Sequence, residues 1–146
     1  MSHYTILKTF MKDSAALVKA LADMGYNTVE VLDVPLPLYG YQGDFRRADN
    51  LNAHTRSADE AKKAHVIVRR KYIDSAANDL GFERLSDGTF GAIISGYDSR
   101  RHNAAWVNKL QQRYSYHVAK KKVVGMGFTV QEKVLEDGTI KLFARR

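Results

Sequence analysis

The densest group of chemically capable side chains lies in one short run, Arg113-Tyr114-Ser115-Tyr116-His117. On a helix, Arg113 and His117 stand four residues apart and share a face. A guanidinium beside an imidazole can hold an anion, and the imidazole can act as a general base if its pKa lies near neutrality. No carboxylate or nucleophile stands at a matching spacing, so a half-buried helix face with polar tips at its rim is favoured. We therefore predict Arg113, Tyr114, Tyr116 and His117 as binding residues and assign no catalytic residue.

Lysines on either side of this run extend the pattern. The spacing of Lys109, Arg113 and Lys120 is compatible with one helix face, whereas Lys121 and Lys122 turn away from it. Such a stripe could face phosphates. The competing explanation is that lysines in the last helical turn only complement the helix dipole. Lys109 and Lys120 join the predicted binding residues.

A second candidate is the aromatic loop Tyr39-Gly40-Tyr41-Gln42-Gly43. Its glycines permit positive φ angles, and its tyrosines offer surfaces for stacking or for contact with a partner. The loop lacks the spacing of a phosphate-binding loop. A structural turn is therefore the favoured interpretation, and Tyr39, Tyr41 and Gln42 are the binding residues it would supply.

Neither metal nor cofactor is predicted. The chain has five histidines and no cysteine, which excludes disulfides, thiolate metal sites and a cysteine nucleophile, and which fits a reducing compartment. No two histidines stand four residues apart, so a metal site would have to be assembled by the fold. A small enzyme or ligand-binding protein would have to use His117, Arg113 and Tyr116, with His3 as a further candidate.

The net charge of +7 is unevenly distributed. Residues 99–146 carry eleven Lys or Arg and three Asp or Glu side chains, a net of +8, while residues 1–98 carry a net of −1. This asymmetry raises the odds of an anionic partner. Solvation of a long helix and an outer strand is nevertheless the favoured explanation.

A chain of 146 residues is the size of one domain, and we expect residues 1–146 to form a single one. No stretch approaches the roughly 20 apolar residues of a membrane span. We therefore expect a soluble protein of the cytoplasm, or of the plastid stroma if the chain is plastid-encoded.

Periodicity and turn residues predict strands, two main helices and one long excursion. The first helix is capped by Asp13 or Ser14 and ends at Gly25, and the second begins near Asn103. The excursion covers about residues 35–63 and carries a short helix from Ser57 through Lys63. The predicted strands are residues 4–10, 28–32, 65–72, 80–85, 89–95, 128–135 and 139–144.

The ends of the two helices look alike, Leu-Ala-Asp-Met-Gly-Tyr at 21–26 and Val-Val-Gly-Met-Gly-Phe at 123–128. Each junction lies between a helix and a strand, which suggests an internal β-α-β-β repeat, although generic helix-capping chemistry explains the likeness too. We predict an α+β two-layer sandwich: an antiparallel sheet of about six or seven strands with both main helices on one face.

Several motifs resemble one family along nearly the whole chain. They are Met1-Ser2-His3-Tyr4-Thr5, Leu21 with Met24-Gly25-Tyr26, Gly40-Tyr41-Gln42-Gly43, Asn78-Asp79-Leu80-Gly81-Phe82, Gln112 through His117, and Gly127-Phe128 with Asp137-Gly138-Thr139-Ile140. The chain resembles the domain-of-unknown-function family that includes the plastid and cyanobacterial hypothetical reading frame thirty-five proteins. Family members often end in a tryptophan after a basic residue, whereas this chain ends in Arg145-Arg146.

The resemblance implies an intracellular protein of bacterial, plastid or phage type and no particular activity. We expect a non-enzymatic binding or accessory module that contacts a protein or an anionic partner. A direct nucleic-acid-binding protein is the first alternative, and a small enzyme or ligand-binding protein with a site near His117 is the second.

Overall fold

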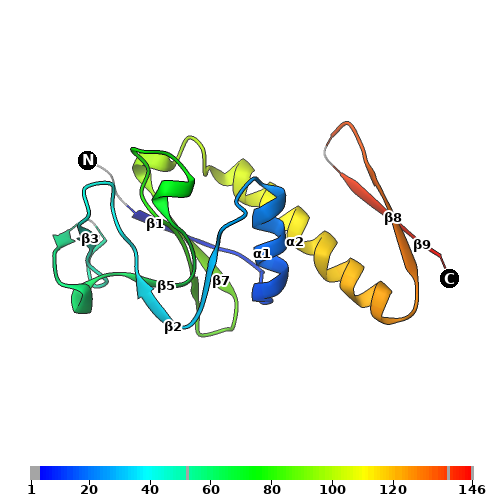
Figure 1. Ribbon diagram of the computed structural model, residues 1–146, viewed down its shortest axis with the longest axis horizontal. Helices are drawn as coiled ribbons and strands as arrows, with labels where there is room; N and C mark the ends of the chain where they lie inside the picture. Colours follow the sequence, from blue (N-terminus) through cyan, green and yellow to red (C-terminus); the bar gives the residue numbers. More distant parts are fainter. Residues whose placement is uncertain (1–3, 52, 138, 146) are drawn as a thin grey trace.

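An antiparallel sheet with strand order β1-β7-β6-β5-β2 forms the centre of the molecule (Figure 1). The computed structural model describes residues 4–51, 53–137 and 139–145. The strands of this main sheet are β1 (Tyr4–Lys8), β2 (Glu30–Pro37), β5 (Lys63–Val68), β6 (Leu80–Arg84) and β7 (Phe90–Ser95). With two α-helices beside the sheet, the predicted α+β class is confirmed.

Both helices begin where the sequence predicts, because a side chain caps each of them. The first, α1 (Ser14–Asp23), follows Asp13, whose Oδ1 accepts hydrogen bonds from two backbone N–H groups of the first turn. The second, α2 (Ala104–Gly125), follows Asn103, whose Oδ1 accepts a hydrogen bond from the N–H of Trp106. These contacts satisfy donors that a helix start leaves unpaired.

The two helix ends share one local geometry. Gly25 and Gly127 adopt positive φ angles of 99° and 88°. The residue after each glycine, Tyr26 or Phe128, donates its N–H to the carbonyl five residues earlier. This is the Schellman arrangement, which accounts for the similar sequences of the two junctions.

Beyond the junctions the two units differ. Strand β2 lies at an edge of the main sheet and pairs with β5. Its position explains how it contains both Pro35 and Pro37, because a proline is tolerated on an edge strand. Strands β8 (Thr129–Val134) and β9 (Ile140–Arg145) instead pair with each other as a separate two-stranded sheet.

Both faces of the main sheet are covered, and all six residues of β7 are buried. On one face Phe90, Ala92 and Ile94 of β7 pack with apolar residues of α1 and α2. On the other face Ile93 packs with Leu38, which the excursion contributes. The excursion therefore serves as a second cover for the sheet, and the buried run in β7 follows from this double cover.

Within the excursion the secondary structure is short. It holds β3 (Phe45–Arg46), β4 (His54–Thr55) and a 3-10 helix, η1 (Ala58–Glu60). The predicted helix from Ser57 to Lys63 is reduced to η1, because Lys63 already pairs in β5. Similarly, the predicted strand 65–72 ends at Val68, and a 3-10 helix, η2 (Arg70–Tyr72), follows it.

The C-terminal part of α2 extends away from the sheet. The buried residues of α2 lie between Val107 and Tyr116. Beyond Tyr116 the helix continues past the sheet and turns back into the β8–β9 hairpin, which stands beside its distal half (Figure 1). We call residues 117–137 and 139–145 the arm.

Candidate functional site

Arg113 and His117 share a face of α2, as predicted, and carboxylates from two other elements meet them. Nε of Arg113 lies 2.7 Å from Oδ2 of Asp23 in α1, and its Nη1 lies 2.9 Å from Oε1 of Glu132 in β8. Nε2 of His117 lies 2.6 Å from the same Asp23 oxygen and donates to it. The fold therefore supplies the carboxylates that the spacing along the chain lacked.

Asp23, Arg113, His117 and Glu132 form one connected network of ion pairs and hydrogen bonds. The side chains of Arg113 and His117 are 18% and 14% exposed. Partial burial opposes ionisation of Asp23, but the hydrogen bonds from His117 and Arg113 outweigh it and hold its pKa below the usual value. The network links α1 and α2 to the hairpin and engages the Nε2 of His117, so its geometry suits a structural tie better than a catalytic centre.

The two tyrosines of the run have different surroundings. Tyr114 is buried in the core, and its hydroxyl accepts hydrogen bonds from the backbone N–H groups of Lys12 and Asp13 at 2.9 and 2.8 Å. Its contacts position the start of α1. The hydroxyl of Tyr116 hydrogen-bonds with Glu132. This bond, together with burial, raises the pKa of Tyr116 to about 12. The ammonium of Lys120 lies 5.8 Å from the centre of the Tyr116 ring.

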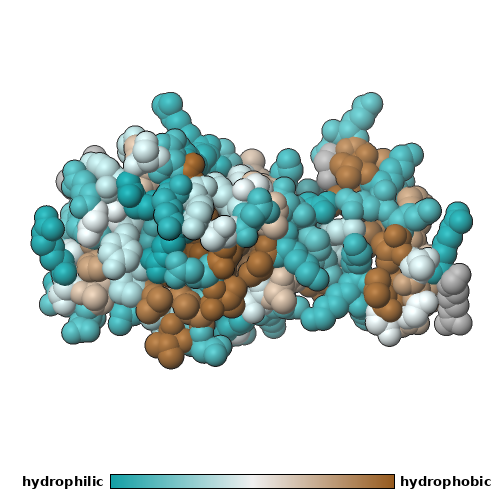
Figure 2. Space-filling model, in the orientation of Figure 1, coloured by the Kyte–Doolittle hydropathy of each residue, from teal (hydrophilic) through white to brown (hydrophobic). Residues whose placement is uncertain are grey.

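Tyr116 also lines a groove of about 460 Å³ between α2 and the hairpin. Much of the groove surface is apolar and comes from Phe10, two residues beyond β1, from Ala119 of α2 and from Ile140 and Leu142 of β9. Polar side chains also line the groove, namely Asn108, Gln111, Gln112, Ser115 and Thr139. In Figure 2, apolar side chains are visible on the arm as well as on the part of the main body over β2. The predicted residues Lys109 and Lys120 are exposed on α2.

The outer face of the hairpin has a composition of its own. Val130, Ile140 and Leu142 are half-buried, and by strand alternation they share the face of the hairpin that faces α2. The opposite face carries Thr129, Gln131, Lys133, Lys141, Phe143 and Arg145, all exposed. Lys133 lies directly opposite Lys141, and Phe143 is 49% exposed between Lys141 and Arg145. These six positions hold three cations and no carboxylate.

The second predicted candidate, the aromatic loop, lies elsewhere and contributes to a pocket of about 400 Å³. Tyr41 and Gln42 line it, together with Asp44, Arg46, His54 and Tyr97. Tyr39 points elsewhere: its ring packs on Phe45 at 4.8 Å between centroids and lies under the guanidinium of Arg69. The loop therefore provides two of its three predicted residues to one site.

Buried polar residues hold this loop in place. Asn78 accepts a hydrogen bond from the N–H of Tyr41 at 3.0 Å and donates to Oγ of Ser95 at 2.8 Å. Its neighbour Asp79 accepts from the N–H of Tyr39 and from Arg69, both at 2.8 Å. These bonds fix the loop against the ends of β6 and β7, so the pocket is built on the main sheet.

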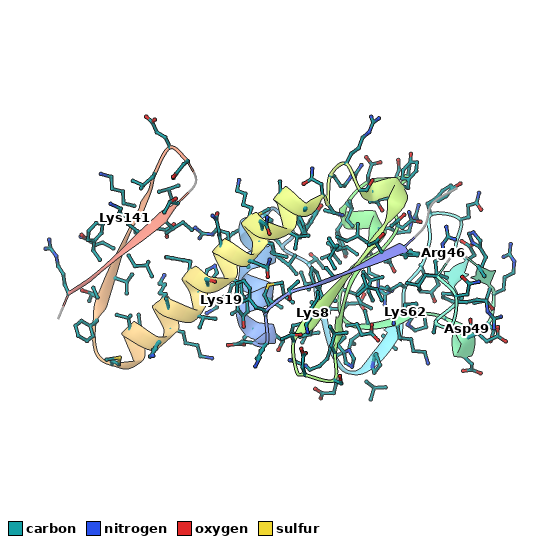
Figure 3. All side chains as sticks on the ribbon, turned by 180° about the vertical axis from the view of Figure 1, so that it is seen from behind. Lys8, Lys19, Arg46, Asp49, Lys62 and Lys141 are labelled. Atoms are coloured by element: carbon teal, nitrogen blue, oxygen red, sulfur yellow. The ribbon has the colours of Figure 1, made fainter. Side chains whose placement is uncertain are left out.

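The two candidate regions lie at opposite ends of the molecule. Figure 3 labels Lys141 on the hairpin and Arg46 at the far side of the main sheet. Sequence reasoning missed the pocket residues Arg46 and His54, since the excursion shows no periodicity from which their positions could be read. It also missed Tyr97, which follows β7 and meets the excursion only in the fold. It also missed Lys133, Lys141 and Phe143, whose alternation along the hairpin was the available signal. His3 lies outside the described residues.

The described residues contain no group of three or more His, Asp or Glu side chains that could hold a metal ion. Within the same part of the chain, no helix is both long enough and apolar enough to cross a membrane.

Comparison with known proteins places the chain in a family. Neither the curated proteins nor the solved structures gave a match. A family model described as "Protein of unknown function (DUF1257)" matches residues 50–143. This segment begins inside the excursion and includes β5, β6, β7, α2 and most of the hairpin, whereas β1, α1 and the Tyr39–Gly43 loop precede it. The chain therefore belongs to the DUF1257 family of proteins of unknown function.

Proposed function

We propose that this protein is a non-enzymatic binding module whose arm contacts an acidic partner protein. The observation that carries the proposal is the outer face of the hairpin, where exposed Phe143 lies among Lys133, Lys141 and Arg145 without a neighbouring carboxylate on that face. An apolar anchor with a basic surround is complementary to an acidic surface that presents an apolar residue.

The shape of the arm supports the same proposal. Large apolar side chains remain exposed along it, namely Val118, Val124, Met126, Val134 and Phe143. Much of the surface that lines the groove beside Tyr116 is apolar. An arm that projects from the core with such residues can bury them against a partner.

The lysine pair gives a second argument. Like charges directly opposite one another across two strands destabilise a hairpin. Lys133 and Lys141 are such a pair. A carboxylate from a partner placed between them would relieve this repulsion, so the pair favours binding of an acidic group over solvation alone.

Single-stranded nucleic acid is the second candidate, because an exposed aromatic ring among cations is also the composition of a stacking platform. The same face would carry it. The groove on the other side of the hairpin favours a protein, because much of its surface is apolar and the described residues that line it include no lysine or arginine to pair with phosphates. We infer an intracellular setting, the cytoplasm or the plastid stroma, because a cysteine-free chain fits a reducing compartment.

The test begins with a photo-reactive phenylalanine analogue at position 143, which captures the partner in cells. The affinity of the captured partner is then measured by calorimetry for Lys141→Glu and Lys19→Glu. Lys19 is an exposed lysine on α1, well away from the hairpin (Figure 3), and serves as the charge-matched control. We expect Lys141→Glu to weaken binding about fivefold or more and Lys19→Glu to leave it unchanged.

Lys141→Glu separates binding from folding. It places a carboxylate opposite Lys133, which should stabilise the hairpin by about 0.2–1 kcal/mol. A loss of affinity therefore cannot come from a disordered hairpin. Equal affinity of both variants would contradict the proposal, and so would cross-linking at position 143 to nucleic acid alone, which would favour the second candidate.

A further inference from the structure

We infer that the pocket beside the aromatic loop binds a mononucleotide, with its base on Tyr41 and Tyr97 and its phosphate near Arg100. This site lies at the end of the molecule opposite the arm and is independent of the proposed function.

Two exposed aromatic rings face the pocket. The rings of Tyr41 and Tyr97 are nearly parallel, with an interplanar angle of 18° and centroids 6.2 Å apart. They are 47% and 57% exposed, so solvent reaches their surfaces. Tyrosine rings that solvent reaches offer apolar surface on which a flat ligand can stack. Parallel rings at a pocket entrance suit a flat heteroaromatic base.

The neighbouring wall offers polar groups for the edge of a base. Gln42 and the hydrogen-bonded pair Asp44 and His54 place an amide, a carboxylate and an imidazole on the lining of the pocket. Each can donate to or accept from a ring nitrogen or an exocyclic group. The volume of about 400 Å³ is within the usual range for small-molecule sites.

Cations stand on both sides of Tyr97. Arg46, only 7% exposed, lines the pocket, and its guanidinium lies 5.6 Å from the centre of the Tyr4 ring. A second hollow shares Tyr97 and is lined by Arg100 and Arg101. Arg101 forms an ion pair with Asp74. Arg100 is exposed, and its side chain forms no ion pair with another described residue.

Two buried oxygens behind this wall also remain without a hydrogen-bond partner among the described residues. They are Oη of Tyr4 and Oδ1 of Asp98. The Tyr4 ring lies against Arg46, and Asp98 accepts a hydrogen bond from the N–H of Asn78, so both belong to the layer that supports the pocket. Buried polar atoms are usually paired in a finished structure. Neither Tyr4 nor Asp98 lines the pocket, so these two atoms belong to its support and make no contact with the ligand.

A planar base together with an anionic phosphate satisfies the aromatic pair and Arg100 at once. A sugar phosphate would leave the rings exposed, and a neutral nucleoside would leave Arg100 without a counterion. The polar groups of the wall suit the edge of a purine or of a pyrimidine, so a mononucleotide with either base fits the pocket.

The test is calorimetric titration of the full chain with AMP, GMP, CMP and UMP, with adenosine and ribose 5-phosphate as partial ligands. We expect at least one mononucleotide to bind with a Kd below about 1 mM and each of its two fragments to bind at least about tenfold more weakly. Tyr97→Ala and Arg100→Ala should each weaken binding about tenfold. Tyr72→Ala, which removes an exposed tyrosine of η2, is the matched control.

The inference would be overturned by the absence of binding by all four mononucleotides or by full affinity in the Tyr97→Ala variant. Ribose 5-phosphate binding as tightly as the nucleotide would overturn it too. Binding of a short oligonucleotide about 100-fold more tightly than any mononucleotide would also overturn it, because the site would then belong to a single strand. Circular dichroism of each variant confirms that the fold is retained.

Discussion

Nε2 of His117 lies 2.6 Å from Oδ2 of Asp23, although 94 positions separate the two residues in the chain. The same oxygen accepts a hydrogen bond from Arg113. The carboxylate of Asp23, at the end of α1, therefore accepts hydrogen bonds from both Arg113 and His117 of α2 and links the two helices.

Removal of this carboxylate's charge should destabilise the protein. We expect Asp23→Asn to lower the free energy of unfolding by about 1–2 kcal/mol, because two charge-assisted hydrogen bonds are weakened at a partly exposed site. Urea unfolding at pH 7 measures the change, with Asp33→Asn, an exposed position on β2, as control.

The pKa of Asp23 is depressed in the folded protein. Its stabilisation is therefore present above the unfolded value near 3.8 and is lost as the pH falls through the folded value. The difference between wild type and Asp23→Asn should vanish at low pH, and equal stability at pH 7 would contradict the assigned role.

The second carboxylate of the network should control the hairpin rather than the core. Glu132 bonds to Arg113 at 2.9 Å, and the hairpin makes no strand pairing with the main sheet in the part of the chain that is described. We expect Glu132→Ala to increase amide hydrogen exchange throughout β8 and β9, with a loss of less than about 1 kcal/mol in global stability. Glu136→Ala, in the exposed turn, should leave exchange in both strands unchanged. An unchanged exchange rate in Glu132→Ala would show that other contacts hold the hairpin.

His102 should remain neutral well below the usual pKa of histidine. It is 2% exposed, packs against Trp106 at 4.5 Å between ring centroids and hydrogen-bonds with the hydroxyl of Tyr26 at 2.7 Å. Burial, assisted by the charge of Arg101, lowers its pKa to about 4. An NMR titration of its ring protons should therefore show no transition between about pH 5.5 and 7.5. A transition near pH 6.5 would contradict the burial of an uncharged ring.

The same shift makes stability depend on pH. The unfolded chain takes up a proton on His102 near pH 6.5, whereas the folded chain does so only near pH 4. His102 therefore destabilises the fold progressively as the pH falls from about 6.5 to 4, by up to about 3 kcal/mol. Asp98, whose pKa is raised by burial, acts in the opposite direction at the lower end of this range. Thermal unfolding at pH 7 and pH 5.5 measures the effect, which should be absent in His102→Gln.

Gly81 should tolerate no side chain. A Cβ added there would lie 2.8 Å from both Cδ atoms of Leu38 and 2.9 Å from Cβ of Ala64. We expect Gly81→Ala to destabilise the protein by about 1–3 kcal/mol, because the excursion would be forced away from the sheet. Gly125, the last residue of α2, has open space around its Cβ position, and Gly125→Ala should be neutral or stabilise the helix by up to about 1 kcal/mol. Chemical denaturation of both variants makes the comparison, and equal stabilities would contradict close packing at Gly81.

Local sequence features were sufficient for the starts of both main helices and for strands β6 and β7. Asp13 and Asn103 begin helices because their side chains can reach free N–H groups one turn later, and Gly25 ends one because it can adopt a positive φ. Alternating and continuous apolar runs identified strands β6 and β7 within a residue or two. The α+β class follows from these elements, because two amphipathic helices must cover a sheet. All of these interactions span a few residues, so the pattern along the chain contains them.

The sequence by itself thus determined where both main helices begin and where β6 and β7 lie, and that the C-terminal third of the chain is strongly basic. Only the tertiary structure decided that β8 and β9 stand apart from the main sheet, that Asp23 and Glu132 meet Arg113, and that Arg46 and Tyr97 share a pocket. The physical reason is that these contacts join residues far apart in the chain. Their geometry depends on how the sheet is ordered and on the path of the excursion, which no local periodicity specifies.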